Sequence, residues 1–249
     1  QMDWVSRLNH ALEESRFMLF AQRMTPIQPD LPAEPHLEVL LRMRDVDGRL
    51  LEPMSFLPAA ERFAVMNAID RWVVRATLRT LSSMLGARSA TSPGTPRVSI
   101  NLSATSITSP AVNRDIIDAI RTSSFPPQCL CFEITETAAI ANLAEASRFI
   151  GDLRDLGCKI ALDDVGTGFS SFGYLRTLPV DYLKIDGSFV RTILDDPVDR
   201  AMVESIQRIA QVMNVRTIAE YVEDVRLLPV LREIGVGYAQ GMGIHRPEP

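Results

Sequence analysis

The sequence predicts an α/β fold, a TIM-type (β/α)8 barrel, and two observations carry the prediction. Eight short apolar segments have the length and residue types of β-strands. Most of them are separated by stretches whose apolar residues recur at every third and fourth position, as on one face of a helix. Strand–helix alternation favours a parallel sheet, and eight strands favour a closed barrel over an open sheet.

The strands are expected at eight places in chain order. Their ranges are 17–24, 36–43, 97–103, 129–135, 159–164, 182–186, 216–222 and 237–241. Only a short, turn-rich segment separates the first two strands, so we expect them to pair as an antiparallel hairpin. The first strand would then run antiparallel to the rest of the barrel.

Helices are expected in the connections between the strands. Helical periodicity covers the ranges 54–85, 109–123, 139–157 and 197–214. The pair Ser109-Pro110 has residue types that often start a helix, which supports the second range.

Length, charge and composition narrow the class of protein. The chain has 249 residues, of which 46% are hydrophobic, and one domain spanning 1–249 is expected. The net charge is −5 and no Lys/Arg run appears, which argues against a nucleic-acid polymer as partner. No apolar stretch reaches the roughly 18 residues of a membrane span, so no membrane contact by this domain is expected.

The beginning of the chain and its cysteines bear on its setting. Residues 1–10 lack an initiator Met and a signal-peptide pattern, so we expect a piece of a larger protein. The chain has three cysteines, Cys129, Cys131 and Cys158, and a small, odd number argues against a disulfide framework. They indicate buried thiols in a reducing, cytoplasmic location, although the full-length protein could still be anchored in a membrane.

Alternation along the strands separates large aliphatic side chains from small or polar ones. The aliphatic set would face the helices, and the polar set would point into the barrel. Inside the barrel the polar set would bring together Glu38, Asn101, Glu133, Asp163 and Lys184, joined by Gln22, Glu220 and Gln240. Several carboxylates cannot stay uncompensated in a low-dielectric interior.

Two interpretations of this buried charge stay open. One is a structural salt-bridge network around Lys184. The other is a divalent-metal site, which we favour because one lysine cannot balance so many acids and because Asn and carboxylate oxygens suit Mg²⁺ or Mn²⁺. Barrel enzymes also carry their active sites at the carboxyl ends of the strands, where these residues gather.

The adjacent Asp163 and Asp164, followed by Gly-Thr-Gly, admit the same two kinds of explanation. Two neighbouring carboxylates repel each other unless a cation or a hydrogen-bond network compensates them. The simpler alternative is a polar loop after a strand, with an Asp capping the next helix.

Seven short motifs now identify a resemblance. They are EVLLR (38–42), INLSA (100–104), FEITE (132–136), ALDDVGTGFSS (161–171), LKID (183–186), IAEYVE (218–223) and AQG (239–241). In this order and at this spacing they resemble the EAL-domain family of cyclic di-GMP phosphodiesterases over the whole chain. A segment like the one that follows the name motif in this family is also present, at residues 55–74.

The resemblance implies a role for each matching position. The metal ligands would be Glu38, Asn101, Glu133, Asp163, Asp164 and Glu220. The catalytic residues would be Lys184, which contacts the attacking water, and Glu220, which is tied to the base role. The substrate-binding positions would be Gln22, Arg42 and Gln240. Glu136 matches the glutamate that anchors the Asp-Asp loop.

The resemblance also implies a reaction and partners. Two divalent cations, Mg²⁺ or Mn²⁺, would support hydrolysis of cyclic di-GMP to linear 5′-pGpG, and Ca²⁺ would inhibit it. A homodimer and attached GGDEF or sensory domains are expected. One alternative is a weak or inactive EAL domain that serves as a cyclic di-GMP receptor. Another is an unrelated metal-dependent barrel such as an enolase-type lyase, which would explain the acids but not the ordered motifs.

Four residues depart from the family pattern, and none is a metal-ligand position. Arg23 stands where Pro is usual, Val39 replaces the Ala of the name motif, and Val165 replaces Phe in the Asp-Asp loop. Val165 puts in doubt how the loop would report to a dimer interface. Tyr221 replaces Gly directly after Glu220, where it either reshapes the pocket or points outward to the helices.

Overall fold

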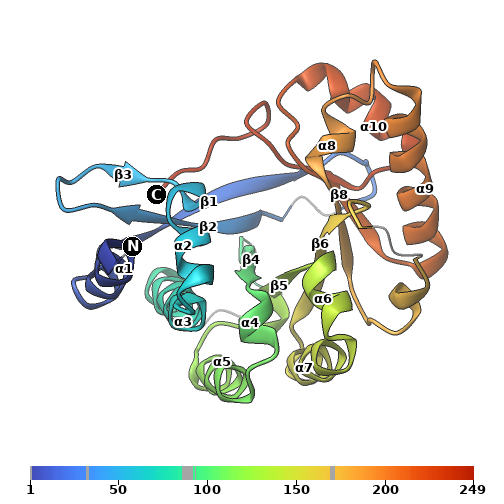
Figure 1. Ribbon diagram of the computed structural model, residues 1–249. Helices are drawn as coiled ribbons and strands as arrows, with labels where there is room; N and C mark the ends of the chain where they lie inside the picture. Colours follow the sequence, from blue (N-terminus) through green and yellow to red (C-terminus); the bar gives the residue numbers. More distant parts are fainter. Residues whose placement is uncertain (1, 32–33, 86–91, 93, 169–171) are drawn as a thin grey trace.

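Eight strands close into a barrel in the computed structural model, which describes residues 2–31, 34–85, 92, 94–168 and 172–249 (Figure 1). The ring consists of β1 (Phe17–Pro26), β2 (His36–Arg44), β4 (Arg97–Leu102), β5 (Leu130–Thr135), β6 (Lys159–Val165), β7 (Tyr182–Ile185), β8 (Arg216–Ala219) and β9 (Tyr238–Ala239). A short strand, β3 (Leu50–Leu51), extends the hairpin beyond the ring. The predicted barrel is therefore confirmed.

The orientation of the strands also agrees with the prediction. β1 pairs antiparallel with β2 over the register Phe17↔Met43 to Met24↔His36, and antiparallel with β9 on its other side. The pairs from β2–β4 round to β8–β9 are all parallel. The carboxyl ends of seven strands consequently meet at one mouth of the barrel.

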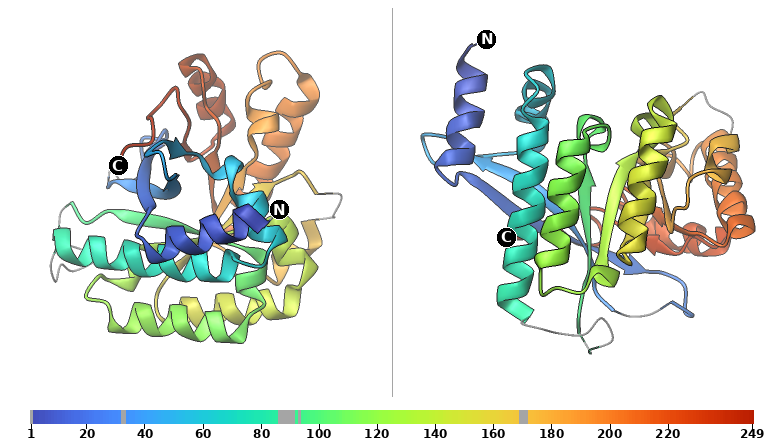
Figure 2. Two further views of the ribbon diagram at one scale, coloured as in Figure 1. Left: turned by 60° about the vertical axis from the view of Figure 1, so that its left-hand side comes forward. Right: turned by 90° about the horizontal axis from the view of Figure 1, so that it is seen from below.

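Helices cover the outside of this ring. They are α1 (Met2–Glu13), α2 (Leu57–Arg62), α3 (Met66–Leu85), α4 (Ala104–Ile107), α5 (Pro110–Thr122), α6 (Glu136–Ala141), α7 (Leu143–Asp155), α8 (Gly187–Val190), α9 (Pro197–Met213) and α10 (Leu228–Ile234). Four 3₁₀ turns lie between them, η1 (Pro53–Ser55), η2 (Pro127–Cys129), η3 (Phe172–Arg176) and η4 (Val225–Leu227). Figure 2 shows α3, α5 and α7 side by side along one flank of the barrel.

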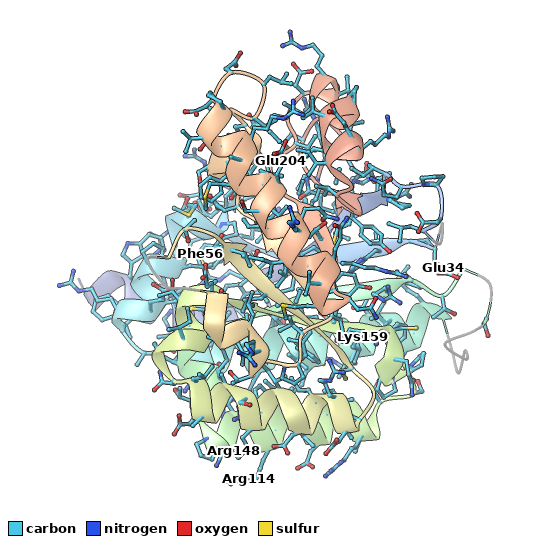
Figure 3. The ribbon with its side chains drawn as sticks, turned by 90° about the vertical axis from the view of Figure 1, so that its right-hand side faces the viewer. Glu34, Phe56, Arg114, Arg148, Lys159 and Glu204 are labelled. Carbon is cyan, nitrogen blue, oxygen red and sulfur yellow. The ribbon has the colours of Figure 1, made fainter. Side chains whose placement is uncertain are left out.

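The core lies between the helices and the outer face of the strands. Aliphatic and aromatic strand residues such as Ile100, Phe132 and Leu162 have no exposed surface there. Charged residues such as Arg114 on α5 and Arg148 on α7 are exposed and point away from this layer (Figure 3). A second, smaller apolar cluster fills the closed end of the barrel interior, formed by Met24, Cys131, Ala161, Tyr182, Ile218 and Tyr238. The three cysteines are buried and free, as predicted.

Several predicted boundaries were wrong. The expected helix over 54–85 is broken into η1, α2 and α3, and Ala64 at the second break has a left-handed φ of +57°. The expected helix over 139–157 divides at Asn142 into α6 and α7. β8 ends at Ala219 rather than at residue 222, because Tyr221 has a φ of +51° that ends the extended conformation. Among the described residues, no helix is both long and apolar enough to span a bilayer.

Candidate active site

Lys184 lies at the centre of the barrel mouth with no exposed side-chain surface. Its Nζ is 2.5 Å from Glu133 Oε2, 2.8 Å from Glu220 Oε1, 3.3 Å from Asp163 Oδ1 and 3.4 Å from Glu38 Oε2. Four different strands or strand ends supply these carboxylates, and β7 supplies the lysine. The strand-parity prediction brought together the same residues.

The parallel register explains this convergence. Asn101 on β4 pairs with Glu133 on β5, and Thr135, two residues further along β5, pairs with Asp163 on β6. Side chains two apart on a strand share a face, so residues from neighbouring strands line up on the inner wall. The acids of β5 and β6 therefore collect near the carboxyl ends of these two strands.

Amide side chains hold Glu38 in place. Asn101 Nδ2 donates to Glu38 Oε1 at 2.6 Å, and Gln240 Nε2 donates to Glu38 Oε2 at 2.6 Å. Gln240 Nε2 also lies 3.0 Å from Gln22 Oε1, while Gln22 Nε2 donates to the carbonyl of His245 at 2.8 Å. Two of the predicted substrate-side residues thus contact one another, and one of them, Gln240, also contacts a predicted metal ligand.

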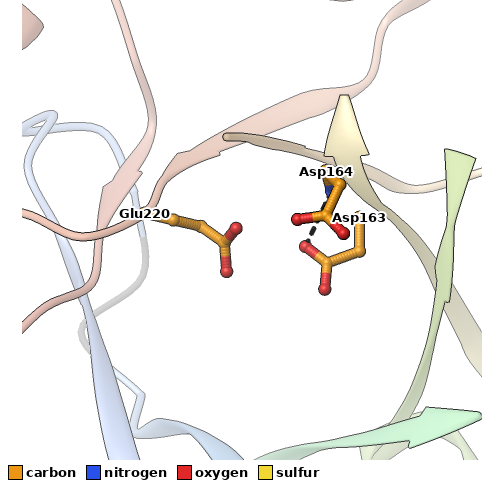
Figure 4. A group of neighbouring side chains, drawn as sticks. All are labelled: Asp163, Asp164 and Glu220. Carbon is orange, nitrogen blue, oxygen red and sulfur yellow. Dashed lines mark hydrogen bonds between the residues drawn. The ribbon is translucent and has the colours of Figure 1, made fainter. Parts of the chain in front are cut away.

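Asp163, Asp164 and Glu220 form a compact acidic group within the site. Each offers one carboxylate oxygen, and these oxygens all lie within 4.8 Å of one another (Figure 4). The backbone N–H of Asp164 donates to Asp163 Oδ1 at 3.0 Å, and Asp164 has a φ of +55°. The β6–β7 register shifts at this point, so both consecutive aspartates reach the site although a regular strand would separate them.

Burial and charge shift the pKa values of these groups. Burial, reinforced by Glu38 and Asp163 and opposed by Lys184, raises the pKa of Glu133 to about 8. Burial, together with the neighbouring Asp163 and Asp186, raises the pKa of Asp164 to about 6.

The other buried groups respond to the same surroundings. Burial raises the pKa of Glu220 well above its usual value, in spite of Lys184. Burial would also raise the pKa of Glu38, but Lys184 and the amides of Gln240 and Asn101 outweigh it and lower that pKa. Burial would lower the pKa of Lys184, but the surrounding carboxylates raise it well above its usual value, so the lysine stays charged.

The residues at the mouth fit a divalent cation. One ammonium faces four carboxylates, and Asp164 adds a fifth acid nearby. Glu133 Oε1 is buried and accepts no hydrogen bond from any described residue. A salt-bridge network around Lys184 is present, as one interpretation of the sequence expected. It holds more acids than one ammonium can balance, and oxygen ligands of this kind suit Mg²⁺ or Mn²⁺.

Arg42 lies on the same face of β2 as Glu38, four residues closer to the mouth. Its side chain is buried, with the guanidinium carbon 5.3 Å from the Phe20 ring centroid and Nη1 donating to the carbonyl of Leu41 at 2.9 Å. The interactions described for Arg42 are therefore with the hairpin and not with the acidic group.

Glu136 is the first residue of α6 and is buried. Its Oε2 accepts a hydrogen bond from the backbone N–H of Gly166 at 3.0 Å, and its Oε1 accepts one from the Tyr174 hydroxyl at 2.6 Å. Gly166 has a φ of +103°, so the loop turns sharply where glycine allows it. The Thr167 hydroxyl instead donates to the carbonyl of Asp164 at 2.9 Å, and residues 169–171 of this loop lie outside the described part of the chain.

Two residues at this site escaped the sequence analysis. Tyr174 on η3 is a direct partner of Glu136. Asp186 lies beside Asp164 and caps α8 by accepting from the backbone N–H of Ser188 at 2.8 Å. The Asp-Gly-Ser sequence after a strand was a capping signal that could have identified Asp186. No comparable local signal marks Tyr174.

A closed barrel with a buried acidic cluster at the mouth defines a class of barrel suited to binding divalent cations. Comparison with known protein families identifies the family to which the chain belongs. The sequence pattern of the EAL domain matches residues 5–247, and the chain belongs to the EAL domain family. The family recognised from the seven motifs is thereby confirmed.

Two curated relatives are named as cyclic di-GMP phosphodiesterases. The chain is 41% identical over 248 residues to cyclic di-GMP phosphodiesterase PdeB of Shewanella oneidensis, covering 99% of this chain and 28% of PdeB. It is 35% identical over 245 residues to cyclic di-GMP phosphodiesterase PdeF of Escherichia coli, covering 98% of this chain and 32% of PdeF. The chain therefore spans about a third of the length of these relatives.

Solved structures share the fold over almost the entire chain. The PaMucR phosphodiesterase in complex with c-di-GMP superposes with a TM-score of 0.89 at 29% identity, covering 99% of this chain and 98% of that one. The FimX EAL domain from Pseudomonas aeruginosa bound to c-di-GMP also gives a TM-score of 0.89, at 27% identity, with coverage of 99% and 96%.

Proposed function

We propose that this domain hydrolyses cyclic di-GMP to linear 5′-pGpG with the help of two divalent cations. The observation that carries the proposal is the complete acidic set around Lys184 in a member of the EAL family. Relatives named as cyclic di-GMP phosphodiesterases support it.

The residues that would hold the cations are Glu38, Asn101, Glu133, Asp163, Asp164 and Glu220. When bound, Mg²⁺ or Mn²⁺ supplies a water of lowered pKa and neutralises charge on the phosphodiester oxygens. Lys184 is the fixed positive charge beside the attacking water, since its ammonium lies between Glu220 and Asp163. Glu220, whose Oε1 lies 2.8 Å from the Lys184 ammonium, would take up the proton of that water as its carboxylate.

The substrate side would involve the residues next to Glu38. Gln22 and Gln240 line the wall of the hairpin and β9, where their amides can exchange a partner within the protein for one on the nucleotide. Arg42 would bind a phosphate of the nucleotide near the mouth. To do so its guanidinium would give up the hydrogen bond to the carbonyl of Leu41. Positioning and preorganised charge are the contributions of this chain to the reaction.

Incubation of the purified domain with cyclic di-GMP tests the proposal. Chromatography should show 5′-pGpG with Mg²⁺ or Mn²⁺ and no product with a chelator. Ca²⁺ should bind but support little turnover, because it is larger and less demanding of geometry. Turnover that survives complete metal removal would contradict the two-cation account.

A receptor that binds cyclic di-GMP without cleaving it is the second candidate. One observation favours it: a structural neighbour, the FimX EAL domain from Pseudomonas aeruginosa, is bound to c-di-GMP in its solved structure. Tight binding in calorimetry with no 5′-pGpG after prolonged incubation with Mn²⁺ would establish this role.

We also propose that the domain forms a homodimer and acts within a larger cytoplasmic signalling protein that carries GGDEF or sensory domains. The length of the curated relatives is consistent with further domains. Sedimentation equilibrium of the domain with and without cyclic di-GMP would test the dimer.

A further inference from the structure

Tyr221 directly follows Glu220 and has a backbone conformation that suits glycine. Its φ is +51°, which brings the Cβ of an L residue close to the following carbonyl group. The backbone is held on both sides of it: Glu220 N donates to the carbonyl of Ile185 at 3.2 Å, and Val222 N donates to the carbonyl of Gln240 at 2.9 Å. The chain thus keeps a costly conformation at a residue next to the acidic site, as strained residues at functional sites often do.

The Tyr221 side chain fills the space over Gly187, the first residue of α8. A Cβ on Gly187 would lie 2.4 Å from Tyr221 Cδ2 and 2.7 Å from Tyr221 Cβ. Both distances are shorter than non-bonded contacts of a Cβ atom in proteins. The φ of Gly187 is not in the left-handed region, so its backbone does not require glycine. The missing side chain at position 187 therefore makes room for Tyr221.

The other end of α8 also holds the ring. The guanidinium carbon of Arg191 lies 4.4 Å from the Tyr221 ring centroid, and Arg191 Nη2 lies 3.4 Å from Glu223 Oε1. Tyr221 is half exposed, yet both ends of one short helix contact its ring. The turn after β8 is consequently fastened to α8.

This contact joins two sides of the acidic group. Glu220 precedes Tyr221, and Asp186 precedes Gly187 in the chain. Asp186 lies against Asp164, which belongs to the same compact group as Glu220. The fit between Tyr221 and Gly187 therefore joins the turn that carries Glu220 to the helix that follows Asp186.

We propose that Tyr221 is a positioning residue of the divalent-cation site, acting through Glu220. The inference rests on the proposed function, because it assigns Tyr221 to the cation site of that reaction. The ring is the acting group, since it fills the space over Gly187 and lies against the guanidinium of Arg191.

Mn²⁺ binding to the metal-free protein, measured by calorimetry without nucleotide, tests the proposal. Tyr221→Gly should bind Mn²⁺ about tenfold more weakly, as is typical when a residue that orients a ligand is lost. Tyr221→Phe keeps the ring and should bind like the wild type. Thermal unfolding of each variant shows that it is folded under the conditions of the titration.

A pair of glycine variants makes the test sharper. Gly187→Ala should weaken Mn²⁺ binding because the new Cβ displaces the ring, whereas Gly151→Ala on α7 is a matched control with no atom within 4 Å of its new Cβ. Adding Tyr221→Gly to Gly187→Ala removes the clash, so the double variant should bind no more weakly than Tyr221→Gly alone.

Wild-type affinity in Tyr221→Gly, or additive losses in the double variant, would overturn the inference. The readout is independent of catalysis: a wild-type protein that binds Mn²⁺ but forms no 5′-pGpG would refute the proposed reaction and leave the positioning role standing. A wild-type protein that binds no Mn²⁺ would refute both.

Discussion

Lys184 and Glu133 form a fully buried ion pair, with Nζ 2.5 Å from Oε2 and neither side chain exposed to solvent. The pair is not balanced, because the same ammonium also serves Asp163, Glu220 and Glu38. Burial, reinforced by Glu38 and Asp163, raises the pKa of Glu133 in spite of a lysine in direct contact. In the metal-free protein the site therefore holds more carboxyl groups than the Lys184 ammonium can balance.

Glu133→Gln should abolish most of the activity while leaving the fold intact. The substitution keeps the shape of the side chain but removes an anionic group from the centre of the site. We expect a loss of at least about a hundredfold in kcat, as for other lost electrostatic groups. A chromatographic assay at saturating Mg²⁺ gives the rate, and circular dichroism checks the fold. Normal hydrolysis by the variant would make Glu133 a structural acid.

The metal-free protein should lose stability as the pH rises from about 4.5 towards about 8. In that window the unfolded chain has lost the Glu133 proton, since the ordinary pKa is 4.5, whereas the folded protein still holds it with a pKa of about 8. Because the folded state binds more protons, raising the pH favours unfolding. Glu220, whose pKa is also raised, contributes with the same sign.

Urea unfolding in a chelating buffer at a series of pH values measures this effect. Lys184 stays charged throughout the window and does not contribute to the slope. Glu133→Gln is the control, and its free energy of unfolding should depend less on pH than that of the wild type. Parallel pH profiles of the two proteins would show that Glu133 is ionised throughout the window.

Lys184→Met should destabilise the metal-free protein strongly. Removing one partner of a buried pair leaves uncompensated charge and typically costs about 3–5 kcal/mol. Here several carboxylates lose their shared cation at once. Mn²⁺ should restore more stability to the variant than to the wild type, since the variant holds the same acids without their lysine. An equal gain in both proteins would show that the lysine and the cations act on different acids.

Strand parity predicted the site because β2, β4, β5 and β7 are regular strands at the positions of the site residues. Glu38, Asn101, Glu133 and Lys184 occupy inward positions on extended strands, so a period of two was enough to group them. Tyr182 and Cys131 followed the same rule and lie inside the closed end. The order of strands and helices therefore predicted the fold class, and the alternation of apolar and polar residues along the strands predicted most of the acidic set.

Parity failed where the backbone leaves the regular strand. Asp164 reaches the site through a left-handed φ and a register shift, and Tyr221 ends β8 in the same way. Tyr seldom adopts a positive φ, and Asp, although enriched there, mostly has a negative φ, so neither residue type by itself predicts the turn. The role of Tyr174 depends on a contact across 38 positions of the chain, and no local pattern reveals such a contact.

The hydrogen bonds of Glu136 are expected to hold the loop after β6 in place. Glu136 accepts from Gly166 N and from the Tyr174 hydroxyl, and Asp164 lies two residues before Gly166. A hydrogen bond to a charged group contributes roughly 1.5–3 kcal/mol, so Glu136→Ala should loosen the loop without removing a metal ligand. Misplacing Asp164 by about one ångström can cost on the order of a hundredfold in rate.

Metal titrations separate this effect from the loss of a ligand. Glu136→Ala should be weakly active at limiting Mg²⁺ and partly rescued at high Mg²⁺, because the ligands remain and only their placement is relaxed. Glu133→Gln should show no such rescue. Tyr174→Phe removes one of the two hydrogen bonds to Glu136 and keeps the ring, so it should lie between the wild type and Glu136→Ala. If Glu136→Ala matches the wild type at limiting Mg²⁺, the position of Asp164 does not depend on Glu136, and the sharp turn at Gly166 is sufficient to hold it.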